Sequence, residues 1–103
     1  MRMPKNIRSS LSGNFRVSEA RQFQADLEDD FRGQQIKIKS KLNIYVYPQL
    51  RQNPYFGKNI KKLKNYTPDT WRYRIGDFRF FYVIDERDQM IIMTAADNRG
   101  SAY

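Results

Sequence analysis

The sequence contains no cysteine and no histidine among its 103 residues. Without cysteine the chain can form no disulfide and offers no thiolate to a zinc ion. Without histidine it lacks the commonest metal ligand and the commonest general base near neutral pH. Sites that depend on a Ser–His or Cys–His pair are therefore excluded, and we expect neither a bound metal nor a cofactor.

Acidic residues are scarce in the middle of the chain. None occurs from Phe31 through Pro68, and the net charge of the whole sequence is +8. The basic residues of this acid-free stretch include Lys37, Lys39, Lys41, Arg51, Lys58, Lys61, Lys62 and Lys64. Such a balance favours nucleic acid, an acidic protein or an anionic membrane surface as a partner.

Long apolar runs are also missing. No segment approaches the ~20 apolar residues that span a bilayer, and residues 1–13 do not fit a secretory signal. We therefore expect a cytoplasmic protein. Residues 1–13 are polar and predict a flexible basic tail, and residues 14–103 have the length of one folded domain.

The most informative segment runs from Trp71 to Tyr82 and predicts two strands joined by a Gly76–Asp77 turn. One face of this hairpin is apolar, with Trp71, Tyr73, Ile75, Phe78, Phe80 and Tyr82. The other face carries Arg72, and a two-residue loop places Arg74 opposite Arg79. Facing arginines repel each other, so we expect an anion between them.

The remaining chain predicts an α+β domain. A short strand at residues 15–17 precedes a helix that Ser18 would cap and that would end near Asp30. Residues 34–47 fit a strand and a helix equally well, and Pro48 should end either element. We interpret residues 58–66 as a basic connector, and residues 80–85 and 90–96 as strands.

Three segments together resemble the RelE/ParE superfamily of type II toxins. They are KKLKNY at residues 61–66, WRYRIGDFRFFYVID at residues 71–85 and NRGSAY at residues 98–103. The resemblance covers residues 15–103. It implies a small antiparallel sheet packed against two N-terminal helices in the order β-α-α-β-β-β, with residues 34–47 mostly helical.

The RelE branch of this superfamily implies a ribosome-dependent messenger-RNA endoribonuclease that needs no metal. In that reaction the ribose 2′-OH attacks the adjacent phosphodiester, which inhibits translation. The resemblance assigns the catalytic residues Arg74, Arg79, Arg99 and Tyr103. The residues expected to contact RNA phosphates are Arg72, Lys58, Lys61, Lys62 and Lys64.

The resemblance also implies partners. They are a cognate antitoxin, expected to be acidic, then the ribosome with its mRNA, and operator DNA for the toxin–antitoxin pair, with no membrane. Two alternatives remain open. One is a ParE-like inhibitor of DNA gyrase, for which Tyr103 would be dispensable. The other is a catalytically inactive relative that binds only RNA or antitoxin.

Overall fold

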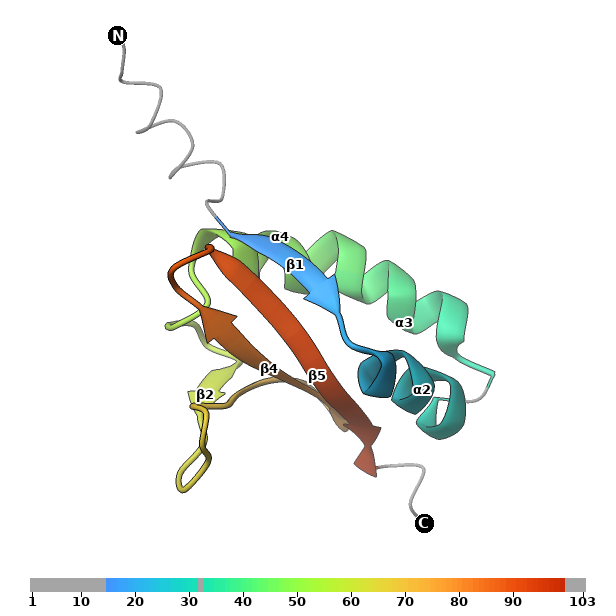
Figure 1. Ribbon diagram of the computed structural model, residues 1–103. Coiled ribbons are helices and arrows are strands. Elements are labelled where there is room, and N and C mark those ends of the chain that lie inside the picture. Colours follow the sequence, from blue (N-terminus) through green and yellow to red (C-terminus); the bar gives the residue numbers. More distant parts are fainter. Residues whose placement is uncertain (1–14, 32, 100–103) are drawn as a thin grey trace, which may run out of the picture.

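A five-stranded sheet forms the centre of the computed structural model, which describes residues 15–31 and 33–99. The strands are β1 (Arg16–Glu19), β2 (Ile60–Lys62), β3 (Trp71–Ile75), β4 (Phe78–Asp85) and β5 (Met90–Asn98). Their order across the sheet is β1–β5–β4–β3–β2. The helical segments cover one face of this sheet and leave the other face uncovered (Figure 1).

The helical region consists of α2 (Arg21–Asp30), α3 (Gln35–Lys41), a π-helical turn η1 (Leu42–Val46) and α4 (Tyr47–Gln52). In α2, Phe23 and Leu27 lie four residues apart and are both buried, as the apolar spacing predicted. Ser18 does not cap this helix, because it lies within β1 and Ala20 occupies the N-cap.

The second helical region passes through Pro48 and ends only at Gln52, halfway along the chain. The expectation that Pro48 ends the element was therefore wrong. Proline is tolerated in the first turn of a helix, and a π-helical turn immediately precedes it. The Tyr47 N–H donates to the Leu42 carbonyl, five residues back, so the hydrogen-bond register shifts just before Pro48.

The sheet differs from the predicted one in two respects. It is mixed and not antiparallel, because β1 pairs in parallel with β5. The segment predicted as a basic connector also contains β2, which pairs antiparallel with β3. The element order is therefore β-α-α-π-α-β-β-β-β, and the prediction of β-α-α-β-β-β holds only at the level of an α+β class.

The arginine hairpin has the predicted register. Ile75 pairs with Phe78, and Arg74 pairs with Arg79. Gly76 has φ of 55°, which the first position of a type II′ turn requires and which glycine adopts without strain. The apolar face of the hairpin belongs to the core, where Tyr73, Phe80 and Tyr82 are buried.

An aromatic cluster joins the first helix to the sheet. Phe31 packs against Phe78 and Phe80, with ring centroids 5.2 and 6.1 Å apart, and Phe23 lies 6.2 Å from Phe80. Phe23, Phe31 and Phe80 have no exposed surface. Because buried aromatic side chains contribute strongly to core stability, this cluster fixes α2 to the covered face of the sheet.

Two buried tyrosines donate hydrogen bonds from the core to polar groups at its boundary. Tyr47 donates a hydrogen bond to Glu19, and Tyr82 donates to the Pro54 carbonyl at 2.8 Å. Burial raises the pKa of Tyr47, with the Glu19 hydrogen bond adding to it, and burial also raises the pKa of Tyr82. Both phenols therefore keep their protons in the folded state at a pH where the unfolded chain releases them.

This difference predicts a loss of stability in alkali. Below a pH of about 10, which is the ordinary tyrosine pKa, the contribution is complete. Above it the unfolded state binds fewer protons, so the free energy of unfolding should fall by ~1.4 kcal/mol per pH unit for each buried phenol. Urea unfolding between about pH 9 and about pH 11.5 measures this slope. The variant Tyr47→Phe should show a shallower slope, and an unchanged slope would contradict the assignment.

Candidate functional site

The helices cover one face of the sheet and leave the other uncovered (Figure 1). Successive side chains of a strand point to opposite faces. Because Tyr73, Phe80 and Tyr82 are buried in the core, Arg72 and Arg79 lie on the uncovered face. Lys61 of β2 pairs with Arg72 and extends this basic surface to the edge strand.

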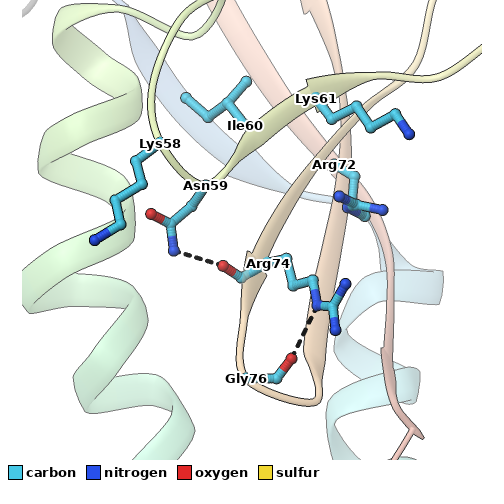
Figure 2. A pocket seen from close by; sticks show the side chains of 7 residues that line it. All are labelled: Lys58, Asn59, Ile60, Lys61, Arg72, Arg74 and Gly76. Atoms are coloured by element: carbon cyan, nitrogen blue, oxygen red, sulfur yellow. Dashed lines mark hydrogen bonds between the residues drawn. The ribbon is translucent and has the colours of Figure 1, made fainter.

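A pocket of about 610 Å³ opens beside the β2–β3 edge (Figure 2). Its lining residues are Lys58, Asn59, Ile60, Lys61, Arg72, Arg74 and Gly76. None of these lining residues from the described part of the chain is acidic. Like charges so close together repel one another, and an anion in the pocket would relieve that repulsion.

The pocket is held in shape by contacts to the backbone. Asn59 donates from Nδ2 to the Arg74 carbonyl at 2.6 Å, and the Arg74 N–H donates to the Asn59 carbonyl at 3.0 Å. The Arg74 side chain donates from Nε to the Gly76 carbonyl at 3.0 Å. These contacts, two of which Figure 2 shows as dashed lines, fix the guanidinium of Arg74 beside the hairpin turn.

Arg72 is the unsatisfied donor of the pocket. Its Nε is buried and has no hydrogen-bond partner among the residues that the structure describes. Buried N–H groups in proteins normally have an acceptor, and hydrogen bonds from a guanidinium to an anionic oxygen are among the stronger ones. Arg72 lines the pocket, so its guanidinium contributes positive charge there, although its buried Nε is closed to an incoming anion.

Arg79 has an anionic partner within the protein. Its Nε donates to Asp97 Oδ1 at 2.7 Å, and its Nη2 donates to Asp97 Oδ2. We expected an anion between Arg74 and Arg79. For Arg79 the negative charge comes instead from the Asp97 carboxylate on β5, the strand on the opposite side from Arg74. Hydrogen bonding to Asp97 raises the pKa of Arg79, burial opposes this, and the charge of Asp97 and the Tyr66 phenol add to the rise.

A β-bulge brings Asp97 to this face. Phe81 pairs with Ala95, whereas the next residue, Tyr82, pairs with Met93. Thr94 is therefore the extra residue of β5, and the inward and outward positions of the strand exchange there. Met93 and Ala96 both face the core, and Asp97 consequently lies opposite Arg79.

The structure places Arg99 at the same end of the sheet. Arg99 is exposed, and its N–H donates to the Asp77 carbonyl in the hairpin turn at 2.9 Å. Arg74, Arg79 and Arg99 therefore gather around one turn, although they come from separate segments. Tyr103, the fourth predicted catalytic residue, lies outside the described residues.

Two of the predicted phosphate contacts lie elsewhere. Lys62 points to the other side of β2, where its Nζ is 5.8 Å from the centroid of the Trp71 ring and 3.3 Å from Asp69 Oδ2. Lys64 is exposed in the loop that follows β2 and does not line the pocket. Of the four predicted lysines, Lys58 and Lys61 line the pocket together with Arg72 and Arg74.

Two residues near Arg79 were not among the predicted site residues. Asp97 could not be placed without knowing the bulge at Thr94. Tyr66 is 53% exposed in the β2–β3 loop, and its phenol makes the smallest contribution to the raised pKa of Arg79. The sequence indicated a basic segment here because of Lys62 and Lys64. It gave no signal that the Tyr66 phenol belongs near the site.

The arrangement can bind and stabilise negative charge. It offers guanidinium groups on β3 and β4 and a lysine on β2, and adjacent strands are separated by ~4.8 Å. Guanidinium forks match phosphate oxygens, so a polyanion crossing the strands would meet one cation after another. Within residues 15–31 and 33–99, no group of acidic side chains is arranged to hold a metal ion.

The α+β fold of this chain is shared with solved toxin–antitoxin complexes. Comparison with solved structures finds RelE toxin chains. The toxin–antitoxin complex RelBE2 of Mycobacterium tuberculosis matches with a TM-score of 0.64 and 19% identity, covering 82% of this chain and 98% of that one. No protein-family model and no curated protein sequence matches.

Two archaeal complexes give the same result. The RelE–RelB complex of Pyrococcus horikoshii matches with a TM-score of 0.54 and 22% identity, covering 84% of this chain and 96% of that one. The RelB–RelE complex of Methanococcus jannaschii matches with a TM-score of 0.56 and 24% identity, covering 82% and 93%. The chain thus has the fold of RelE-like toxins, as the resemblance implied. No helix in the described residues is long and apolar enough to cross a membrane.

Proposed function

We propose that this protein is the toxin of a type II toxin–antitoxin system and acts as a ribosome-dependent messenger-RNA endoribonuclease. The observation that carries the proposal is the gathering of Arg74, Arg79 and Arg99 around the hairpin turn of a RelE-like fold. This face adjoins a basic pocket that would hold the neighbouring RNA backbone.

The proposed reaction is an attack by the ribose on its own phosphodiester. The 2′-oxygen forms a bond to phosphorus while the bond from phosphorus to the 5′-oxygen breaks. The 2′-hydroxyl loses its proton and the leaving oxygen gains one, so the products are a 2′,3′-cyclic phosphate and a 5′-hydroxyl. No metal or external water enters this balance.

The arginines would act by charge stabilisation and not by proton transfer. A guanidinium keeps its proton near neutral pH, so Arg79 and Arg99 suit the phosphate oxygens on which negative charge develops. Tyr103 would position the 2′-hydroxyl or accept its proton if nearby arginines lower its pKa. The ribosome would supply the substrate geometry, which accounts for much of the rate in a well-oriented reaction.

The proposed partner that neutralises the toxin is an acidic antitoxin covering the same face. Phe81 and Val83 of β4 and Ile92 of β5 are half-buried there and form an apolar band beside the arginines. An antitoxin segment with acidic and apolar side chains would complement both parts of this surface. The solved complexes with this fold pair RelE with RelB, which supports a partner of this kind.

The test is induction of the protein in a bacterial host, followed by primer extension on abundant transcripts. We expect cuts inside translated frames that vanish when initiation of translation is blocked. Intact transcripts with a DNA-damage response would indicate a gyrase inhibitor instead. Intact transcripts and normal growth would leave a binding protein without nuclease activity.

A matched pair of tyrosine variants sharpens this test. Tyr103→Phe should relieve growth arrest and reduce cleavage by at least about a hundredfold, the lower end of the range for a side chain that transfers a proton. Tyr45→Phe removes a phenol that is 61% exposed on the helical side of the molecule, and it should remain fully toxic. Full toxicity of folded Tyr103→Phe would remove Tyr103 from the site.

A further inference from the structure

Arg79 and Asp97 form a fork-to-fork ion pair across β4 and β5. Both oxygens of the carboxylate accept hydrogen bonds from the guanidinium, and the Nε–Oδ1 distance is 2.7 Å. The side chains are 26% and 33% exposed. Paired geometry of this kind restricts a guanidinium far more than a single contact does.

A second contact restrains the same group. The Arg79 guanidinium carbon lies 5.7 Å from the centroid of the Phe81 ring, which is two residues further along β4. The guanidinium is therefore held at one edge by Asp97 and over one face by Phe81. Arginine has five N–H donors in a planar fork, and Asp97 uses two of them, so three remain free to meet an anion.

Asp97 has two opposing effects on an approaching phosphate. Its negative charge weakens the attraction between Arg79 and any second anion. Its hydrogen bonds hold the remaining donors of Arg79 in one orientation, and preorganised donors are the ones that lower a barrier. Weaker binding and better orientation are expected to show in different kinetic constants.

We propose that Asp97 is a positioning residue, which orients Arg79 toward the phosphate undergoing cleavage and lowers the affinity for RNA. This inference rests on the proposed nuclease function. It assigns to Asp97 no contact with the substrate. The bulge at Thr94, which turns Asp97 toward Arg79, is the structural device that makes the pair possible.

The variant Asp97→Asn tests the proposal, because an amide cannot accept from both guanidinium nitrogens. With programmed ribosomes carrying mRNA, we expect kcat to fall by about tenfold and KM to decrease. Asp97→Glu keeps the carboxylate and should recover part of kcat. Asp29→Asn is the matched control, since it removes one negative charge from an exposed position on α2, behind the other face of the sheet.

Two readouts do not require cleavage. The Nε–H resonance of Arg79, assigned with Arg79→Lys, should exchange slowly with water in the wild type and rapidly in Asp97→Asn. Binding of an RNA whose 2′-hydroxyl is replaced by hydrogen at the cleavage position should depend more steeply on salt in Asp97→Asn. Freeing one cation for a phosphate steepens the log–log slope by ~0.7 for a single strand. Asp29→Asn should alter neither readout.

The outcomes separate the two proposals. A wild type that cleaves no RNA overturns the nuclease function, whereas an unchanged Arg79 resonance and salt slope in Asp97→Asn overturn the positioning role. The positioning role is also overturned if the lower kcat of Asp97→Asn is explained by a smaller folded fraction of that variant and Asp97→Glu recovers no kcat. Lower kcat with tighter RNA binding, in a protein as stable as the Asp29→Asn control, supports it.

Discussion

Replacing Arg79 by alanine is expected to lower messenger-RNA cleavage by about 10²- to 10³-fold, because one preorganised donor to developing charge is worth ~2.7–4 kcal/mol. Growth arrest on induction should disappear with it. Arg79 is the candidate with the most defined geometry, since Asp97 and Phe81 hold its guanidinium on the uncovered face. Rates measured on programmed ribosomes, with the wild type alongside, give the comparison.

The controls for Arg79 separate charge, shape and folding. Lys64→Ala also removes one positive charge, from an exposed loop position outside the pocket, and should retain most of the activity. Arg79→Lys keeps the charge without the planar fork, so it should fold and still cleave poorly. Urea unfolding of each variant shows whether Asp97, left without its partner, weakens the fold. A folded Arg79→Ala protein that cleaves within about threefold of the wild type would contradict the assignment.

Replacing Phe80 by alanine should produce the largest loss of stability. Phe80 has no exposed surface and packs between Phe23 and Phe31. Truncating a buried phenylalanine costs about 3–5 kcal/mol through lost transfer energy and an unfilled cavity. Because domains of this size are stable by about 5–15 kcal/mol in total, the variant should be marginally folded at best, as urea unfolding will show.

Phe56 provides the matched control for that experiment. It is 78% exposed in the loop after α4, and its truncation to alanine should change the free energy of unfolding by no more than about 0.5 kcal/mol. Equal shifts of the urea midpoint for Phe56→Ala and Phe80→Ala would mean that the aromatic cluster does not stabilise the fold as described.

The arginine hairpin was predictable because its signals are local. Alternation of apolar and basic residues assigned the two faces, and the two-residue loop fixed the pairing of Arg74 with Arg79. The edge strand β2 was not predictable in this way. Only three residues long, with two lysines, it is a strand because β3 pairs with it, and its own sequence indicates a charged loop.

The helical region shows how tertiary packing decides an ambiguous pattern. Ile38 and Leu42 are buried as a helical stripe predicts, but the next buried position is Val46, while Tyr45 is 61% exposed. Ile38, Leu42 and Val46 lie four residues apart, so the buried positions follow helical spacing and not the alternation of a strand. The π-helical turn η1 just before Pro48 has no such signal in the sequence, and the passage through Pro48 could not be foreseen.

The sequence predicted most of the basic residues of the candidate site. It did not predict which way the lysines point or what sets the contact between Arg79 and Asp97. The positions of Arg72, Arg74 and Arg79 follow from the hairpin, and the sequence resemblance supplied Arg99. The opposite orientations of Lys61 and Lys62 follow from β2, which the sequence did not reveal. The sequence offers Asp97 as an acidic structural partner for Arg79, but the bulge that sets their register leaves no signal in the alternation of a mostly apolar strand.

The bulge at Thr94 also gives the end of β5 two separate tasks on its two faces. Ala96 packs in the core, whereas the next residue, Asp97, lies on the other face opposite Arg79. A new side chain at position 97 would alter how Arg79 is held without disturbing the residues that pack beneath α2. A lineage could therefore tune the potency of such a protein by point mutations at the end of one strand, while its folding stayed under separate selection.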